Sequence, residues 1–325
     1  MTGRQGDGLA LFGPSPRVRE AVAASWPGVV AEAGPGAGAG RGRFAGALLW
    51  QGDDAEVAAF LGTHPECRWL HTVAVGVAPE VLRRAAATGL EVTNGAGTHG
   101  SAVAEHVLAV LLAHVKGLPR TLAAQRERKW QVPSASELRG RRVGVLGLGD
   151  IGGRTVRLLE AFGARVTGCR RGTGDPAGSG AAERVPRAVY GRDRIGDFLD
   201  GLDVLVVAVP LTAETRGLIG AAELALLRPG ALLVNVGRGP VVDESALLAA
   251  LRTGRLGGAA LDVFDSEPLP ASSPLWSEPD VLITPHSADA TAETDQRCLD
   301  LLLDNVARFR DGLPLRNVVD PSRGY

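Results

Sequence analysis

The residues best suited to chemistry are an arginine, a glutamate and a histidine in the second half of the chain. Arg238, Glu267 and His286 each stand shortly after an apolar run typical of a buried strand. The carboxyl ends of parallel strands border one crevice, so these side chains are expected to converge there. They suit hydride exchange at a carbon that bears an oxygen. His286 would give or take the proton, Glu267 would hold the imidazole and favour its charged form, and Arg238 would bind a carboxylate and polarise the carbonyl.

Each of the three residues also has a purely structural interpretation. A single histidine after a strand is more often structural than catalytic. An arginine between two glycines, as at Arg238, could simply satisfy backbone carbonyls. The catalytic interpretation is favoured because a second motif, a glycine-rich loop, lies upstream in the same half of the chain.

That second motif is the segment "VGVLGLGDIGGR" (143–154), which has the spacing G-x-G-x-x-G. An apolar run leads into it and a helical pattern follows it, as in a dinucleotide-binding loop. The first glycine permits a tight turn, the second lets the backbone approach a pyrophosphate, and the third lets the helix pack on the strand. The alternative is a tight turn that binds no ligand. We assign these loop residues to cofactor binding: Gly147, Gly149, Asp150, Ile151 and Gly152.

The next apolar run ends in two arginines, where dinucleotide-binding chains commonly place an acidic residue that reads the ribose. Arg170 stands about 20 residues after the glycines, and Arg171 and Thr173 follow it. A guanidinium group pairs well with a phosphate, so we predict binding of NADP(H), with NAD(H) as the other possibility. The alternative is that both arginines are solvated and that Asp175, or no residue, reads the ribose.

Composition excludes several other classes of protein. The 325 residues carry a formal net charge of -1, which gives no electrostatic drive towards nucleic acid or an anionic membrane. Three scattered cysteines offer no metal-ligand spacing and suit a reducing compartment. No signal peptide is recognisable, and the most apolar segment, 103–115, is too short to span a bilayer. We therefore expect a cytoplasmic protein without a metal site.

Apolar runs alternate with helical patterns along the whole chain, which predicts two α/β domains. The runs in the second half are apolar almost throughout, as strands buried on both faces of a parallel sheet must be. We expect a Rossmann-type doubly wound sheet there and a smaller, flavodoxin-like α/β domain before it. The predicted strands of the larger sheet are 141–147, 164–170, 203–210, 231–237, 257–264 and 280–285, and a final helix covers about 290–310.

These motifs together resemble the D-isomer-specific 2-hydroxyacid dehydrogenase family. The resemblance covers most of the second half, in "VLGLGDIGGR", "VPLTAETRGLIG", "LLRPGALLVNVGRGPVVDESALLAAL", "GRLGGAALDVFDSEPLP" and "VLITPHSA". It implies that Arg238 binds the substrate carboxylate and carbonyl, that Glu267 supports the catalytic His286, and that Asp262 lies near the nicotinamide. Pro210 and Thr215, which both lie in the segment "VPLTAETRGLIG", are assigned to cofactor binding.

The resemblance also implies a domain organisation. Residues 1–100 and 288–325 would form a discontinuous substrate-binding domain, and residues 101–287 the dinucleotide-binding domain. The segment "VAEHVLAVLLA" resembles the helix that links the domains and packs in the family's dimer, which implies a homodimer.

The first domain departs from the family pattern in the loop that follows the predicted strand 68–75. The family has a sequence like "AGVD" where this chain has "VGVA", so Ala78 replaces the usual aspartate. Val75 and Gly76 remain the predicted substrate-binding residues, because backbone amides do not depend on side-chain identity. His99, where no histidine is expected, is predicted to lie on the surface rather than to face the substrate.

The resemblance implies an NADP(H)-preferring oxidoreductase that interconverts a small 2-oxoacid and a D-2-hydroxyacid, of the glyoxylate/hydroxypyruvate type. A phosphoglycerate dehydrogenase is disfavoured because no regulatory domain follows residue 325. Two alternatives stay open. One is a specialised reductase of an unusual acid, such as a phosphonate. The other is a non-catalytic, nicotinamide-sensing corepressor of the same fold, which the lack of long tails disfavours.

Overall fold

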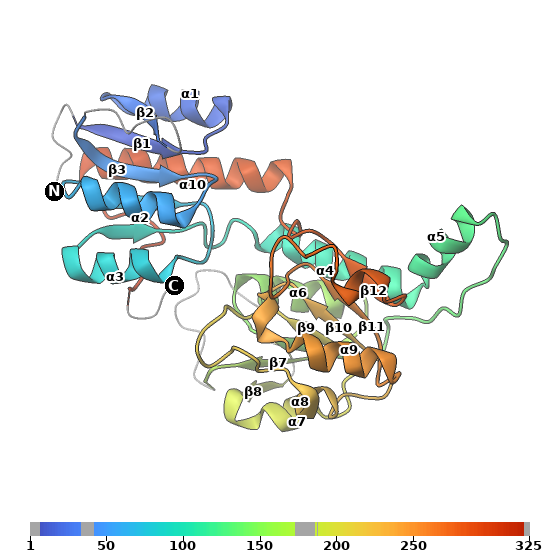
Figure 1. Cartoon of the computed structure of the whole chain (residues 1–325). Helices are drawn as coiled ribbons and strands as arrows, with labels where there is room; N and C mark the ends of the chain where they lie inside the picture. Colours follow the sequence, from blue (N-terminus) through green and yellow to red (C-terminus); the bar gives the residue numbers. More distant parts are fainter. Residues whose placement is uncertain (1–6, 34–41, 173–185, 187, 322–325) are drawn as a thin grey trace. The chain divides into compact units, whose positions relative to one another are not determined.

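The computed structural model describes residues 7–33, 42–172, 186 and 188–321. The chain forms two compact units (Figure 1). Unit 1 comprises Met1–Thr98 and Thr291–Tyr325, and unit 2 comprises His99–Ala290. The α/β fold class predicted from the sequence is confirmed, with one parallel sheet in each unit.

Unit 1 is a five-stranded parallel sheet in the order β2-β1-β3-β4-β5, which is the flavodoxin-like order. Successive residues of a strand point to opposite faces, and β1 shows this directly. Its Leu9 and Leu11 pack with α1 and α10, whereas Ala10 and Phe12 pack with α2 and α3. The elements are β1 Gly8–Phe12, α1 Pro16–Ser25, β2 Val30–Ala33, β3 Phe44–Leu49, α2 Asp54–Thr63, β4 Trp69–Thr72, α3 Pro79–Thr88, β5 Glu91–Thr93 and α10 Ala292–Asp311.

Unit 2 is a seven-stranded parallel sheet in the order β12-β11-β10-β9-β6-β7-β8. Strand order reverses between β6 and β9, which makes the carboxyl ends of these two strands the switch point of a doubly wound sheet. The strands are β6 Arg142–Leu146, β7 Arg165–Arg170, β8 Val189–Gly191, β9 Val204–Val207, β10 Ala231–Asn235, β11 Leu256–Leu261 and β12 Val281–Ile283. The six predicted strands are all present. The short β8 at the edge is additional, because its brief apolar stretch stands between arginines and does not resemble a strand.

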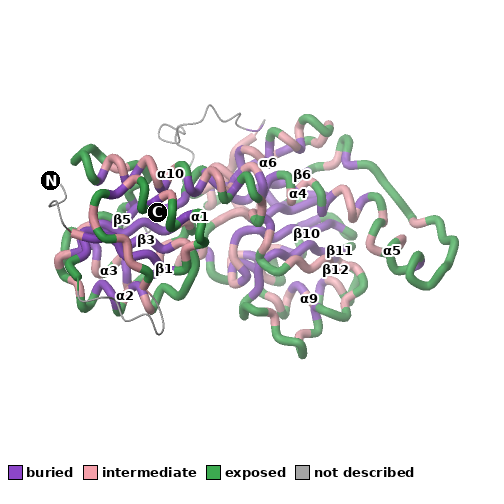
Figure 2. Tube along the Cα trace, turned by 90° about the horizontal axis from the view of Figure 1, so that it is seen from above, coloured by how far each residue is buried: buried purple, intermediate pink, exposed green. Residues whose placement is uncertain are grey.

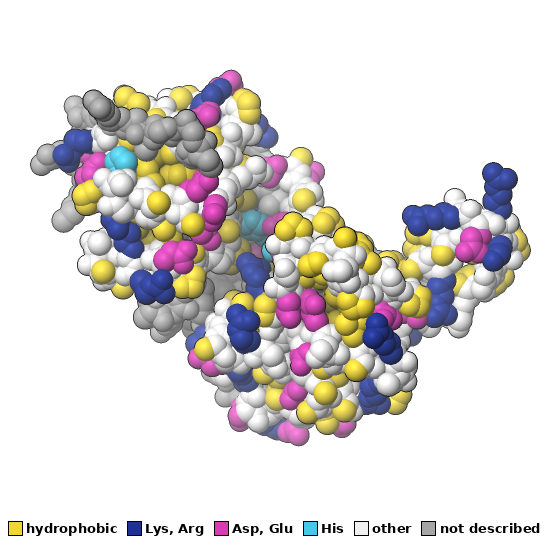
Figure 3. Space-filling model, viewed as in Figure 1, with side chains coloured by type: hydrophobic (Ala, Val, Ile, Leu, Met, Phe, Trp, Pro, Cys, Tyr) yellow, Lys and Arg dark blue, Asp and Glu magenta, His cyan; other side chains and the backbone are white. Residues whose placement is uncertain are grey.

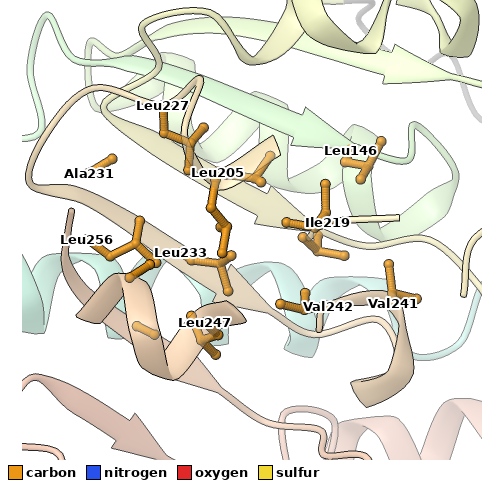
Figure 4. Close-up of a cluster of buried hydrophobic side chains, with 14 of the residues drawn as sticks. Leu146, Leu205, Ile219, Leu227, Ala231, Leu233, Val241, Val242, Leu247 and Leu256 are labelled. Carbon is orange, nitrogen blue, oxygen red and sulfur yellow. The ribbon is translucent and has the colours of Figure 1, made fainter. Parts of the chain in front are cut away.

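Helices cover both faces of the unit 2 sheet and bury it (Figure 2). α4 and α6 pack on one face, and α7, α8 and α9 with their connecting loops pack on the other (Figure 4). This double burial explains the near-continuous apolar strands seen in the sequence. The helices are α4 Gly100–Val115, α5 Leu118–Arg126, α6 Asp150–Ala161, α7 Ile195–Leu199, α8 Ala221–Leu224 and α9 Glu244–Arg252.

Membrane-spanning potential is confined to one pair of helices. Over the described part of the chain, no single helix has the length and apolar character needed to cross a bilayer. α4 and α5 meet that test only when taken together, and a bend of 66° separates them.

One buried histidine lies in the unit 1 sheet. His71 of β4 is 1% exposed, and its Nδ1 lies 2.8 Å from Thr93 Oγ1 on the neighbouring strand. The same hydroxyl accepts a hydrogen bond from Trp69 Nε1, and His71 Nε2 has no partner among the described residues. Because burial penalises the charged imidazole, it lowers the pKa of His71 from 6.5 to about 4.

Acid should therefore weaken unit 1 through His71. In the unfolded chain the imidazole gains a proton below its ordinary pKa of 6.5, whereas the folded imidazole stays neutral down to about pH 4. Stability is unaffected above pH 6.5 and falls as the pH drops from 6.5 towards 4, by up to about 3 kcal/mol. The measurement is hydrogen exchange of the β4 and β5 amides across this range, corrected for the intrinsic exchange rate.

The control is His71→Leu, which removes the titrating group and keeps an apolar side chain of similar size. In this variant, the protection of the β4 and β5 amides against hydrogen exchange should no longer fall as the pH drops from 6.5 towards 4. Amides of the unit 2 sheet serve as an internal reference, because His71 belongs to unit 1. An unaltered pH dependence in the leucine variant would show that another group is responsible.

Candidate active site

The glycine-rich loop joins β6 to α6 at the switch point of the unit 2 sheet. Gly147 has φ +99°, a conformation that favours glycine, and a Cβ there would lie 2.5 Å from the Ala208 carbonyl oxygen at the end of β9. A Cβ on Gly152 would overlap the carbonyl oxygen of Gly147. Gly149, in contrast, is exposed, and no atom lies within 4 Å of where its Cβ would be. Two glycines thus serve packing, and the central one leaves open space.

The amino end of α6 is suited to bind an anion. Gly149 is its N-cap residue and makes no side-chain cap, and among the described residues no side chain accepts a hydrogen bond from the first turn. The Asp150 carboxylate turns away to accept a hydrogen bond from Arg154 Nε at 2.6 Å, so Asp150 and Ile151 offer backbone N–H groups. Free N–H groups and the positive end of the helix dipole fit a pyrophosphate. These features match the dinucleotide cofactor that the motif implies.

The paired arginines stand at the same edge of the sheet as this loop. β7 ends at Arg170, and Gly147 N donates to Cys169 O at 2.8 Å, which brings the turn alongside the end of β7. Arg170 is half-buried and Arg171 is exposed. Thr173 and Asp175 lie outside the described residues.

Arg238 is held by its own loop after β10. The Asn235 side chain, which is buried, accepts a hydrogen bond from Gly237 N and donates one to Arg238 O, both at 3.1 Å. The Arg238 guanidinium donates to Gly237 O at 2.8 Å and is half-buried. A Cβ on Gly239 would overlap the backbone of Phe264, so the loop after β10 lies directly against the loop after β11. Asn235 was missed in the sequence, where it stood inside an apolar run.

His286 and Glu267 form a direct pair. His286 Nδ1 lies 2.6 Å from Glu267 Oε2, and the side chains are 46% and 35% exposed. The other carboxylate oxygen of Glu267 accepts a hydrogen bond from Phe264 N at 2.9 Å, which fixes the acid. Since an ionised carboxylate only accepts, Nδ1 carries the hydrogen and Nε2 is left for proton transfer.

Asp262 supports the segment that carries His286. Its carboxylate is 3% exposed and accepts three hydrogen bonds, from Thr284 Oγ1, Ser287 N and Ala288 N. Its backbone carbonyl accepts from His286 N at 2.9 Å. The carboxylate is therefore engaged with the protein, a role that its place after an apolar strand did not reveal.

The loop after β9 is also held from within. Thr215 Oγ1 donates to the Pro210 carbonyl at 2.7 Å and accepts from Thr212 N at 2.7 Å. Thr215 is 8% exposed, so its hydroxyl shapes this loop at the carboxyl edge of the sheet.

In unit 1, Val75 and Gly76 lie in the loop between β4 and α3, and both are exposed. Asn94 Nδ2 donates to Val75 O at 2.7 Å and anchors that loop. Ala78 is the N-cap residue of α3 and makes no side-chain cap. The aspartate usual at this position would be a good N-cap, so its replacement removes a helix cap and leaves the backbone amides of the loop in place.

The surface position expected for His99 is wrong. Its side chain is only 12% exposed, and its Nε2 lies 3.6 Å from Asp289 Oδ2 within unit 2. His99 is the N-cap residue of α4 and is half-buried. The described residues contain no group of three or more His, Cys, Asp or Glu side chains that could hold a metal ion.

Comparison with known proteins defines the class of enzyme. Residues 108–288 match the model of the D-isomer specific 2-hydroxyacid dehydrogenase, NAD binding domain. A glyoxylate reductase from Aeropyrum pernix is 35% identical over 269 residues, which are 80% of this chain and 78% of that protein. The chain therefore belongs to the D-isomer-specific 2-hydroxyacid dehydrogenase family and is an NAD(P)-dependent oxidoreductase, as the sequence motifs predicted.

Solved structures agree over nearly the whole chain. A D-isomer specific 2-hydroxyacid dehydrogenase from Xanthobacter autotrophicus, in complex with NADPH and MES, is 34% identical with a TM-score of 0.79, and the match covers 98% of this chain and 100% of that one. An NADPH-dependent glyoxylate/hydroxypyruvate reductase from Sinorhizobium meliloti, in complex with NADP and sulfate, is 28% identical with a TM-score of 0.82 at the same coverage. The family assignment thus extends to both units of the fold.

Alanine substitutions should separate the two kinds of glycine in the loop. Gly152→Ala forces a methyl group onto the Gly147 carbonyl and should destabilise unit 2 by about 1–3 kcal/mol or more. Gly149→Ala meets no protein atom and should cost at most about 1 kcal/mol as an N-cap change. It should still weaken NADPH binding, because its methyl group occupies space that the pyrophosphate needs. Thermal unfolding and fluorescence titration with NADPH measure the two effects.

Gly62→Ala is the matched control. Gly62 lies in α2, and no atom lies within 4 Å of its would-be Cβ, so alanine should leave both stability and NADPH binding intact. Normal NADPH binding by Gly149→Ala would contradict a role for this glycine in the approach of the cofactor.

Proposed function

We propose that this protein is an NADP(H)-preferring reductase of small 2-oxoacids, of the glyoxylate/hydroxypyruvate type. The observation that carries the proposal is the His286–Glu267 pair, which stands at the same edge of one parallel sheet as the glycine loop and Arg238. The named activities of the relatives from Aeropyrum pernix and Sinorhizobium meliloti support the substrate class.

The proposed reaction assigns one task to each side chain. A reduced nicotinamide cofactor, held at the glycine loop 147–152, would supply the hydride that the carbonyl carbon of the 2-oxoacid accepts. Arg238 binds the substrate carboxylate and polarises the carbonyl oxygen. His286 donates its Nε2 proton to the oxygen as negative charge develops there, and Glu267 keeps the ring oriented through Nδ1–H. The C=O double bond becomes a C–H and an O–H bond, which yields the 2-hydroxyacid.

Positive charge at the carboxyl end of β7 supports the preference for NADP(H). Arg170 pairs with Gly191 in the sheet, so Arg192, the next residue after β8, joins Arg170 and Arg171 at this edge. The hydrogen bond from Thr212 lowers the pKa of Glu214, and the charges of Arg192 and Arg171 add to this effect. An arginine-rich edge is suited to a 2′-phosphate, whereas an acid would repel it.

The two units take separate roles in this proposal. Unit 2 (His99–Ala290) binds the dinucleotide and corresponds to the domain 101–287 that the family resemblance implies. Unit 1 (Met1–Thr98 and Thr291–Tyr325) is the substrate-binding domain and corresponds to the implied residues 1–100 and 288–325. Val75 and Gly76 stay the predicted substrate-binding residues of unit 1. Among the cofactor-binding residues, Pro210, Thr215 and Asp262 shape loops at the sheet edge, through the hydrogen bonds described above.

We further propose that the protein is a homodimer that pairs through the α5 arm, defined as residues 118–132. The arm projects from the body of unit 2 (Figure 1) and carries apolar side chains among basic ones (Figure 3). Leu118 and Leu122 are about half-exposed, Val132 is mostly exposed, and Trp130 is fully exposed. A second copy of the chain is the occupant favoured by the resemblance of the neighbouring helix α4 to the family's dimer helix. Four large exposed apolar side chains on one projecting segment are unusual on a monomer surface.

The test of the proposed activity is a panel of 2-oxoacids assayed with each reduced cofactor. Glyoxylate and hydroxypyruvate should oxidise NADPH, with kcat/KM higher for NADPH than for NADH. Arg170→Asp replaces a positive charge near the expected 2′-phosphate with a negative one. The substitution should therefore lower kcat/KM for NADPH roughly tenfold or more relative to kcat/KM for NADH. The measurement is the loss of reduced nicotinamide absorbance.

Arg165→Asp is the control for that change. Arg165 lies at the opposite end of the same strand β7 and is exposed, so its reversal of charge should leave the NADPH preference unaltered. An absence of turnover with every acid in the panel would refute the substrate class, and a wild-type preference for NADH would refute the role of the arginines.

Light scattering tests the dimer. The wild-type chain should have twice the mass of a protomer, and Leu122→Asp should shift it to monomer because the charge cannot be buried in an apolar interface. Leu313→Asp in unit 1 is the matched control, since Leu122 and Leu313 are both 54% exposed. A monomeric wild-type protein, or an equal shift in both variants, would contradict pairing through the α5 arm.

A further inference from the structure

We propose that Thr284 and His106 are positioning residues for the reaction. They form a hydrogen-bond chain, from His106 through Thr284 to Asp262, that holds the backbone around His286 in an otherwise unfavourable conformation. The inference rests on the proposed catalytic role of His286. Neither Thr284 nor His106 carried a signal in the sequence that pointed to this role.

The conformation to be held is that of His286 itself. Its φ is +49°, in the left-handed region that a non-glycine residue adopts only at a cost. Such a conformation persists where surrounding contacts over-determine it. Here Asp262 O accepts from His286 N, and the Asp262 carboxylate accepts from the next two amides, Ser287 N at 2.9 Å and Ala288 N at 3.1 Å. Asp262 thus bonds three successive amides around the turn.

Asp262 depends in turn on Thr284. The Thr284 hydroxyl donates to Asp262 Oδ1 at 2.5 Å, the shortest of the bonds to this carboxylate. The carboxylate is 3% exposed, and it forms no ion pair with any described residue. A buried charge of this kind is tolerated only when it is fully hydrogen-bonded. The hydroxyl is therefore one of three donors that keep Asp262 available as the acceptor for the His286 turn.

The direction of the chain identifies the role of His106. Thr284 Oγ1 has one hydrogen, which goes to the carboxylate, so its remaining capacity is as an acceptor. His106 Nε2 lies 3.3 Å from that oxygen and must be the donor. A donor to Thr284 polarises its hydroxyl and strengthens the hydrogen bond to Asp262.

His106 also connects the turn to a rigid element. It lies on α4, whose apolar face packs into the core of unit 2. Two turns further along the same face, His114 Nε2 lies 3.2 Å from the Asp280 carbonyl. Asp280 immediately precedes β12 and Thr284 immediately follows it, so two histidines of one helix contact both ends of this three-residue edge strand. The edge strand that delivers His286 is held by α4 as well as by its single neighbour β11.

The experiment compares Thr284→Val, Thr284→Ser and Thr253→Val in the full chain. Valine has the shape of threonine without the hydroxyl, so kcat for 2-oxoacid reduction should fall about tenfold, as expected for a lost hydrogen bond to a charged group. The dissociation constant for NADPH should not change, and the Ser287 and Ala288 amides should exchange faster. Serine should restore kcat and protection. Thr253→Val, which loses a hydroxyl bonded within α9, should behave as wild type.

His106 variants test the head of the chain. His106→Leu removes the donor and should lower kcat, whereas His106→Gln, which supplies an amide N–H, should recover much of it. The fold-decrease in kcat of the Thr284→Val/His106→Leu double variant should be smaller than the product of the fold-decreases of the two single variants, because both substitutions act through Asp262.

Three outcomes would each overturn the proposal. One is wild-type kcat and wild-type amide protection in Thr284→Val. The second is equal damage from serine and valine. The third is a rise in the NADPH dissociation constant that accounts for the loss of activity. If Thr284→Val does not fold, the serine and His106 variants decide the question. His286→Ala separates this inference from the proposed function: normal turnover there would refute catalysis by His286, while the amide exchange of the Thr284 variants would still test the chain.

Discussion

A buried carboxylate at the carboxyl edge of the unit 2 sheet organises the candidate active site. The Asp262 side chain is removed from water, so each of its oxygens must be hydrogen-bonded. Its partners are the two backbone amides that follow His286 and a single hydroxyl. That requirement holds His286 in a left-handed conformation and presents its ring to Glu267. The hydrogen bonds that the buried carboxylate requires thereby also orient the imidazole of His286.

Close backbone approach provides the second constraint. Gly147 lies against the end of β9, Gly152 against Gly147, and Gly239 against Phe264. At each place a side chain would separate two loops that otherwise touch. Because these loops follow β6, β9, β10 and β11, the glycines draw together the polar ends of successive strands. Asn235 and Thr215 then fix individual loops from within. These contacts hold the edge together on the β9 side of the space left open at Gly149.

Much of this arrangement could be predicted, because it depends on local patterns in the sequence. Continuous apolar runs indicated the buried parallel strands, and the glycine spacing between a strand and a helix indicated the dinucleotide loop. Arg238, Glu267 and His286 could be placed at one sheet edge, since parallel strands end together. β8 was not predicted, because its brief apolar stretch stands between arginines. His99 was placed on the surface, and its burial depends on packing near Asp289 that no local pattern encodes.

The two α/β units, the glycine turn and the types of side chain available for catalysis could be recognised from local sequence, because they depend on neighbours a few residues apart. Which atoms meet depends on the packing of distant segments. His286 and Glu267 are 19 residues apart, and His106 and Thr284 are 178 apart. Their contacts follow from strand register and from the seating of α4 on the sheet, which are set by the packing of the whole core. Asp262 shows the difference most clearly: its position after a strand was readable, and its role as the anchor of the His286 turn was not.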